Sequence, residues 1–200
     1  MIRSAYPKDA ARITNGYLDK DLRPKETRDG EFSFFVNEAK HSGGSVLELA
    51  SGAGRILMVL AEAGVNVFGL EASGPMLAIA KKAIARLPKK TQHRIHLVCG
   101  DMRRFAFKRK FPLIIIPFNS FWFNFYRASL DEYVLAEQCL KSIMMALEHG
   151  GRFIIDSPCE SNHQWWATMA KKFGFTLEIV EPYTGLLSVN VLIGRKDSKG

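Results

Sequence analysis

Residues 46–55 read Val46-Leu-Glu-Leu-Ala-Ser-Gly-Ala-Gly-Arg55, a short apolar run followed by a turn that contains two glycines. The run up to Leu49 predicts a strand, and the apolar residues from Ile56 to Ala63 predict a helix. A glycine turn between a strand and a helix lets the backbone approach a ligand closely and directs the N-terminal N–H groups of the helix toward it. The sequence therefore predicts a ligand-binding turn at Gly52 and Gly54.

This turn lacks the features of several other well-known motifs. The dinucleotide fingerprint requires a glycine or alanine three positions after Gly54, where the helix packs closely on the strand, and Leu57 occupies that position. The chain contains no Gly-Lys-Ser/Thr end of a P-loop and no Gly-x-Ser-x-Gly nucleophile elbow. A nucleotide-dependent oxidoreductase is therefore a disfavoured alternative.

Strand-like and helix-like segments alternate through the rest of the chain, which is typical of a mainly parallel sheet covered by helices on both faces. The last two strand-like runs, Phe175–Ile179 and Leu187–Ile193, are separated by a turn too short for a parallel crossover, so they predict an antiparallel hairpin. We predict an α/β fold, a Rossmann-like doubly wound sheet of seven mainly parallel strands that ends in an antiparallel hairpin. The other strands are expected at residues 65–70, 95–99, 113–116 and 152–156, and the other helices after Ser73, from Tyr133 to Leu147 with an end at Gly150-Gly151, and before Gly174.

The chain is predicted to form a single domain over residues 1–200. The core is expected at 43–200, and the polar segment 1–42 is expected to be an N-terminal helical or lid segment. The chain start lacks the apolar run of a signal peptide, and the longest apolar stretch, Leu113–Phe118, is far shorter than the ~20 residues of a membrane helix. Three cysteines without close spacing do not suggest a disulfide framework. These features predict a cytoplasmic protein without a membrane segment.

A formal net charge of +8 raises the question of an anionic partner. The positive residues fall into separate groups, one at residues 81–94 and another at 103–110, as on solvated surfaces. A small-molecule partner is the first expectation, with anionic molecules among the candidates, and nucleic acid is a less favoured one. His93 and His96 lack acidic or cysteine neighbours, so no metal site is expected.

Acidic residues follow two further predicted strands. Glu71 ends the second strand, where a carboxylate can accept hydrogen bonds from both hydroxyls of a ribose. Gly100-Asp101-Met102 follows the third strand, where the aspartate can accept from an adenine amino group and the methionine can pack on the base. Because the carboxyl ends of parallel strands border one crevice, a single adenosine-containing ligand can contact all three strand ends.

From Gly43 to Asp156 the chain resembles the class I S-adenosylmethionine-dependent methyltransferases of the small-molecule group. The resemblance is carried by the glycine-rich turn after Glu48, by Glu71-Ala-Ser-Gly-Pro-Met-Leu77, by Gly100-Asp101-Met102 and by Pro117-Phe-Asn-Ser-Phe121. It implies S-adenosylmethionine as cofactor and S-adenosylhomocysteine as product. It implies cofactor contacts at Glu48, Ala50, Gly52, Gly54, Arg55, Glu71, Ala72, Met76, Asp101, Met102 and Pro117. Substrate contacts are expected at Asn119 and Ser120, in the segment similar to the one that lines the methyl-transfer site, and at Tyr17, in the expected N-terminal lid segment.

The chain departs from the family pattern at two places that bear on activity. Ala50 stands where the family usually has its first glycine, and the Asn119 region lacks the histidine that some relatives carry. No catalytic base is therefore assigned, and the acceptor atom and the oligomeric state remain open. The expected function is methyl transfer to a small molecule, with a non-catalytic protein of the same fold or a nucleic-acid methyltransferase as alternatives.

Overall fold

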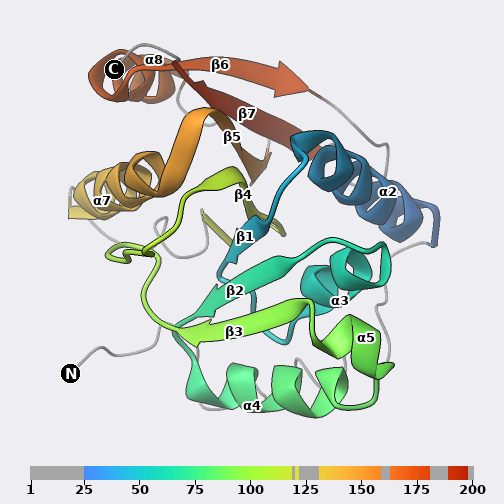
Figure 1. Cartoon of the computed structure of the whole chain (residues 1–200). Helices are drawn as coiled ribbons and strands as arrows, with labels where there is room; N and C mark the ends of the chain where they lie inside the picture. Colours follow the sequence, from blue (N-terminus) through green and yellow to red (C-terminus); the bar gives the residue numbers. More distant parts are fainter. Residues whose placement is uncertain (1–24, 119, 122–130, 159–162, 181–188, 198–200) are drawn as a thin grey trace.

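The protein is described by a computed structural model that covers residues 25–118, 120–121, 131–158, 163–180 and 189–197. A seven-stranded sheet runs through the centre of the molecule in the order β3-β2-β1-β4-β5-β7-β6 (Figure 1). Its strands are β1 (Val46–Leu49), β2 (Val67–Glu71), β3 (Ile95–Cys99), β4 (Phe111–Ile116), β5 (Leu147–Pro158), β6 (Phe175–Val180) and β7 (Val189–Lys196). The helices are α2 (Lys25–Ser42), α3 (Arg55–Glu62), α4 (Gly74–Ile84), α5 (Lys89–Gln92), α7 (Asp131–Ala146) and α8 (His163–Phe173).

The strand pairing confirms the predicted fold class. Strands β1 to β5 pair in parallel, and β7 pairs antiparallel with both β5 and β6. The closing hairpin therefore inserts its second strand, β7, between β5 and β6. In the part of the chain that the structure describes, no helix is long and apolar enough to cross a membrane.

Helices cover both faces of the sheet, with α2 and α3 on one side and α7 and α8 on the other (Figure 1). The side chains of β1 alternate between these two layers, as the period of two in a strand requires. Val46 belongs to the core cluster under α2 and α3, whereas Leu47 and Leu49 belong to the cluster under α7 and α8. Glu48 lies two residues after Val46 in the same strand, so its side chain is on the same face, the side of α2 and α3.

The start of β5 differs from the sequence prediction. Helix α7 ends at Ala146, one residue before the predicted Leu147, but β5 begins at Leu147, whereas the sequence predicted a strand only from Arg152, after a stop at Gly150-Gly151. These glycines lie inside β5, where the β4–β5 pairing shifts register between Phe111 and Leu113. Gly150 has a left-handed backbone (φ 74°), and a Cβ at Gly151 would lie 3.2 Å from the backbone oxygen of Phe111. These glycines shape the irregular start of β5, and the predicted start of this strand at Arg152 was wrong.

Leu57 and Gly69 explain how α3 packs on the sheet without the third glycine of the dinucleotide fingerprint. Leu57 is fully buried, and a Cβ placed on Gly69 would lie 2.4 Å from its Cδ1 atom. The space for close helix–strand packing is therefore provided by a glycine on β2, and a large side chain on α3 fills it.

Candidate functional site

The parallel register brings the carboxyl ends of β1, β2 and β3 to one edge of the sheet. Leu49 pairs with Leu70, and Glu71 pairs with Cys99 on the next strand. The turn after β1, the acid at the end of β2 and the Gly100–Met102 segment after β3 are therefore neighbours. This is the edge at which open α/β sheets bind ligands.

The β1–α3 turn has a left-handed backbone at three positions. The φ angles are 54° at Ala50, 55° at Gly52 and 85° at Gly54, which is the N-cap residue of α3. A Cβ on Gly52 would lie 3.2 Å from the Cε atom of Met76, so these two predicted cofactor residues are in close proximity. As the N-cap, Gly54 provides no side-chain cap for the first N–H groups of α3.

Glu71 links the turn after β1 to the loop after β2. Its Oε2 atom accepts a hydrogen bond from the backbone N–H of Gly52 at 2.8 Å, and its Oε1 atom accepts one from Ser73 at 2.7 Å. The side chain is buried, and Ser73 in turn caps α4 by accepting from the Met76 N–H. A carboxylate has about four lone-pair directions, so these two bonds leave acceptor capacity on each oxygen.

Glu48 is a buried carboxyl group with an unsatisfied oxygen. It is 4% exposed, and its Oε2 atom has no hydrogen-bond partner. Burial raises its pKa to about 8; Arg55 opposes this rise, whereas the nearby carboxylates of Glu31 and Glu71 add to it. The hydroxyl of Ser51, also buried, likewise has no partner. These two buried oxygen atoms without hydrogen-bond partners lie beside the glycine turn. They suit a ligand whose ammonium group donates hydrogen bonds to them.

Arg55 joins the first turn of α3 to α2. Its guanidinium group donates to both carboxylate oxygens of Glu31, at 2.5 and 2.9 Å, and lies over the rings of Phe32 and Phe118 at 5.3 and 5.4 Å. Glu31 is 1% exposed, so this is a buried ion pair with bidentate geometry. The sequence predicted Arg55 as a cofactor contact, and that role stays a prediction.

Asp101, after β3, is held by Arg103. Its Oδ1 atom accepts from the backbone N–H of Arg103 at 2.8 Å, and the Arg103 side chain donates to both carboxylate oxygens. Burial favours the protonated form, but the bonds from Arg103 outweigh it and hold the pKa of Asp101 below its usual value. Met102 is buried beside it, whereas Ala72, on the loop after β2, is exposed. The carboxylate of Asp101 is thus ionised and oriented at the predicted adenine edge.

The ends of β4 and β5 form the neighbouring part of the same edge. Phe118 is 44% exposed and has a left-handed backbone (φ 60°), and its N–H donates to Oδ2 of the buried Asp156 at 2.6 Å. Pro117 and Ser120 are buried, whereas Asn119 and Tyr17 lie outside the described residues. Sequence reasoning missed Asp156, although an acid at the end of a predicted strand is the signal that identified Glu71.

The structure thus groups most of the predicted cofactor residues. Those around the β1–α3 turn are linked by direct contacts, and those after β3 lie on the adjacent strand end. The first group comprises Glu48, Ala50, Gly52, Gly54, Arg55, Glu71 and Met76, and the second comprises Asp101 and Met102.

Residues 46–151 match the family model described as "Methyltransferase domain". A dTDP-3-amino-3,6-dideoxy-alpha-D-glucopyranose N,N-dimethyltransferase of Streptomyces fradiae is 37% identical over 101 residues. That match covers 50% of this chain but only 36% of the relative, so the chain corresponds to about a third of that protein's length.

Solved structures of methyltransferases share the fold. The glycopeptide N-methyltransferase MtfA, complexed with S-adenosylmethionine, superposes with a TM-score of 0.70 at 19% identity, over 84% of this chain and 93% of that one. The CcbJ methyltransferase of Streptomyces caelestis gives a TM-score of 0.68 at 20% identity, over 92% and 96% of the two chains. At these identities the likeness establishes the fold, including the sheet with its antiparallel closing hairpin.

Proposed function

The chain belongs to the methyltransferase domain family, and from this membership we propose that it binds S-adenosylmethionine and methylates a small-molecule acceptor. The cofactor site is the edge formed by the ends of β1, β2 and β3. The observation that carries the proposal is the buried carboxyl of Glu48, with its unsatisfied Oε2 atom, next to the glycine turn. An ammonium group at that atom supplies the hydrogen-bond donor that Oε2 lacks.

The remaining contacts follow from the chemistry at each strand end. Glu71, with spare acceptor capacity on both oxygens, holds the ribose hydroxyls. Gly52 and Gly54 allow the methionine part to approach the backbone. The ionised Asp101 accepts from the adenine amino group, and Met102 packs beside the base.

The chain's own residues position the acceptor. S-adenosylmethionine supplies an activated methyl carbon on a sulfonium, so the protein's main contribution is orientation and the exclusion of water. Phe118 presents an exposed ring at the end of β4, anchored through its N–H to Asp156, and forms one wall for the acceptor. Pro117 and Ser120 are buried at its base. A general base is needed only if the acceptor loses its proton before or during attack.

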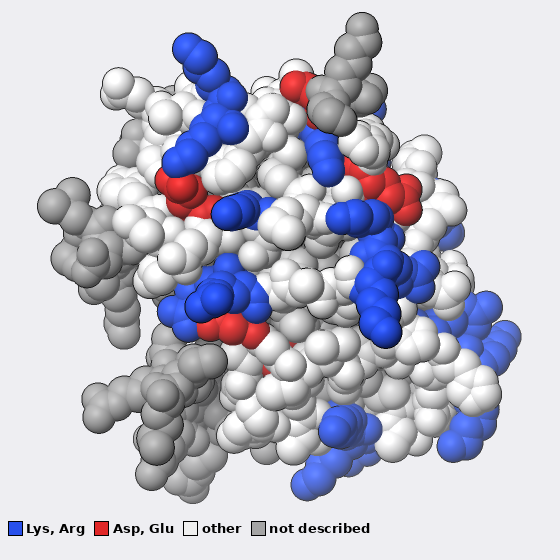
Figure 2. All heavy atoms as spheres, turned by 60° about the vertical axis from the view of Figure 1, so that its left-hand side comes forward, with Lys and Arg blue, Asp and Glu red and all other residues white. Residues whose placement is uncertain are grey.

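The relative from Streptomyces fradiae favours an amino group on a sugar-containing small molecule as the acceptor. A nucleic acid is less well supported. Figure 2 shows lysine and arginine side chains in several separate groups with neutral residues between them, and carboxylates lie beside some of these groups. A polyanionic strand binds best along a continuous positive track.

Calorimetric titration of the full chain with S-adenosylmethionine and S-adenosylhomocysteine tests the cofactor assignment. We expect saturable binding of both and no binding of NADH, which tests the oxidoreductase alternative. Methyl transfer is then tested by mass spectrometry on a panel of amino sugars. Absence of heat and of thermal stabilisation at millimolar cofactor would refute the proposal.

One observation favours a second candidate, a non-catalytic cofactor-binding protein. Ala50 places a methyl group on a left-handed backbone in the turn, where the family usually has a glycine. Cofactor binding without turnover, restored to turnover by Ala50→Gly, would identify this residue as the cause. Binding without turnover in both variants would favour the non-catalytic candidate.

A further inference from the structure

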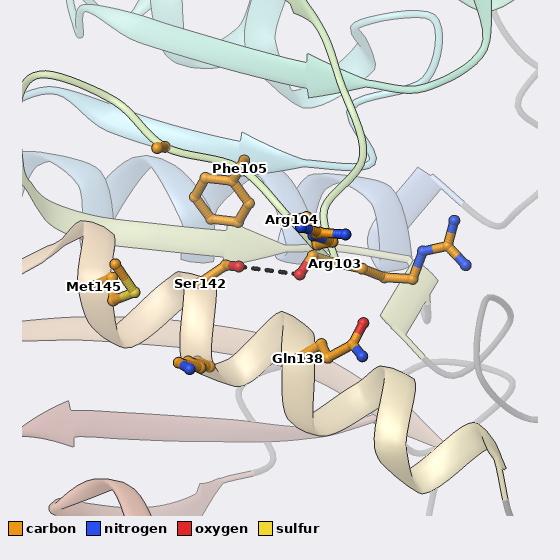
Figure 3. Close-up of a pocket in the computed structure, with 8 residues that line it drawn as sticks. Arg103, Arg104, Phe105, Gln138, Ser142 and Met145 are labelled. Atoms are coloured by element: carbon orange, nitrogen blue, oxygen red, sulfur yellow. Dashed lines mark hydrogen bonds between the residues drawn. The ribbon is translucent and has the colours of Figure 1, made fainter. Parts of the chain in front are cut away.

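A concave site lies between the segment after β3 and helix α7, close to Asp101 of the cofactor edge. Its cavity volume is about 600 Å³, within the range of small-molecule sites. Figure 3 shows Arg103 and Arg104 on the loop opposite α7, with Ser142 pointing from the helix toward that loop. The Ser142 hydroxyl donates to the backbone oxygen of Arg103 at 3.0 Å, so the two walls are fixed relative to each other.

The lining of this pocket carries three positive charges and no carboxylate. Arg103, Arg104 and Lys141 contribute side chains, and Gln138 adds an amide. Arg103 is already bonded to Asp101, but Arg104 and Lys141 make no side-chain ion pair with any residue that the structure describes. The pocket therefore concentrates positive charge that the protein itself does not balance.

The shared concavity is what distinguishes these cations. Arg55, Arg152 and Lys172 each form an ion pair with a glutamate, and the exposed Lys82 has no such pair among the described residues but lies outside the pocket lining. Two unpaired cations that face one concavity, beside a third that is partly neutralised, are suited to an anion.

The C-terminal end of α7 does not repel an anion from this pocket. The C-terminal carbonyls of a helix carry partial negative charge, which by itself repels anions. Here the ammonium group of Lys110 donates to the backbone oxygen of Met145, and Lys196 donates to those of Met144 and Leu147, at 2.9 and 3.3 Å. These lysines offset the negative end of the helix, and the positive field of the pocket is maintained.

We propose that this pocket binds the phosphate group of a small phosphorylated molecule, at a site separate from the cofactor edge. Two guanidinium groups and one ammonium offer donors that suit the several oxygens of a phosphate. Phe105 and Met145 add apolar surface that accommodates the body of such a molecule. The volume of the pocket suits a small molecule, whereas the separate groups of cations on the face in Figure 2 offer no continuous track for a nucleic-acid strand.

Calorimetric titration of the full chain with pyrophosphate, at low salt and without cofactor, tests this inference. We expect one binding site, with affinity reduced about tenfold by Lys141→Gln and by Arg104→Gln, the usual size of one lost charge-assisted contact. Both side chains are exposed, so both variants are expected to fold, and circular dichroism verifies this. Lys82→Gln, which removes the same charge from an exposed position on α4, is the control and leaves the affinity unchanged.

Three results would overturn the proposal. The first is no heat from the folded wild-type chain, and the second is equal weakening by Lys82→Gln and Lys141→Gln, which indicates diffuse charge attraction. The third is a single-stranded oligonucleotide that binds more tightly than pyrophosphate and is weakened by all three substitutions, which indicates a nucleic-acid surface. Because the titration uses no S-adenosylmethionine, its failure is distinct from a failure of the cofactor assignment.

Discussion

The carboxylate of Glu71 accepts a hydrogen bond from the backbone N–H of Gly52, 19 residues earlier in the chain, at 2.8 Å. This bond fixes the glycine turn after β1 to the end of β2, and the second oxygen fixes the loop that begins α4 through Ser73. The residue proposed to hold the ribose is therefore also the residue that holds the turn in place.

Glu71→Gln is expected to weaken S-adenosylmethionine binding at least tenfold and to lower the free energy of unfolding by about 1–3 kcal/mol. The amide replaces one acceptor oxygen with an N–H₂ group, which opposes the N–H of Gly52 or of Ser73. Calorimetry and urea unfolding measure the two effects. Glu62→Gln, an exposed position on α3, serves as control. An unchanged cofactor affinity in Glu71→Gln would remove the ribose assignment.

Glu48 is expected to make the stability of the cofactor-free protein fall as the pH rises. Its pKa is raised from 4.5 to about 8 by burial, so between these values the folded protein holds a proton that the unfolded chain has released. The stabilisation by this proton is complete below pH 4.5 and is lost progressively up to pH 8, with a slope of at most about 1.4 kcal/mol per pH unit. Urea unfolding at several pH values measures this slope.

Glu48→Gln provides the matched control for this slope. Glutamine has the shape of the protonated side chain and does not ionise, so the variant is expected to lose the decline and to exceed the wild type in stability near pH 8. Its affinity for S-adenosylmethionine is expected to fall, because the ammonium loses its carboxylate partner. A variant with the same pH profile as the wild type would show that Glu48 is ionised at neutral pH in the folded state.

The sequence predicted the layout of this site from residues close to strand ends. Glu71 and Asp101 were identified because an acidic residue directly after a predicted strand can be recognised in the sequence. The parallel arrangement of the strands then places both residues at one edge of the sheet. The pairing of Arg55 with Glu31 could not be predicted, because 24 residues separate them and neither carries a local signal for the other. The start of β5 was misplaced because Gly150-Gly151 reads as a helix end, whereas tertiary pairing with β4 uses these glycines for a bulge.

Ala50→Gly is expected to raise the free energy of unfolding by about 1 kcal/mol. An L-residue at φ 54° pays a steric cost that glycine does not, and this gain exceeds the entropy that glycine adds to the unfolded chain. Chemical denaturation measures the change. Ala53→Gly is the control in the same turn, at a buried position without a positive φ, and it is expected to destabilise. Equal destabilisation by both substitutions would contradict the steric interpretation.

The Arg55–Glu31 pair is expected to show strong coupling in a double-mutant cycle. Arg55→Gln alone leaves the buried carboxylate of Glu31 without its guanidinium partner and should cost about 3 kcal/mol. The double variant with Glu31→Gln should lose less than the sum of the single variants, with a coupling energy of about 1–3 kcal/mol. The exposed pair Lys172–Glu137 is the reference and should couple by less than about 1 kcal/mol. Additive losses at Arg55 and Glu31 would mean that this ion pair does not help to hold α2 against α3.

The contact between Leu57 and Gly69 restricts how this turn can evolve. Neither position can change freely alone: a side chain at 69 meets Leu57 and the hydroxyl of Ser51, and a smaller residue at 57 leaves a void against β2. A lineage that exchanged this arrangement for the dinucleotide fingerprint would have to alter both positions, and the intermediate with only one change would be poorly packed. The two residues therefore form an evolutionary barrier, and ancestral or designed sequences that cross it should carry compensating substitutions at both sites.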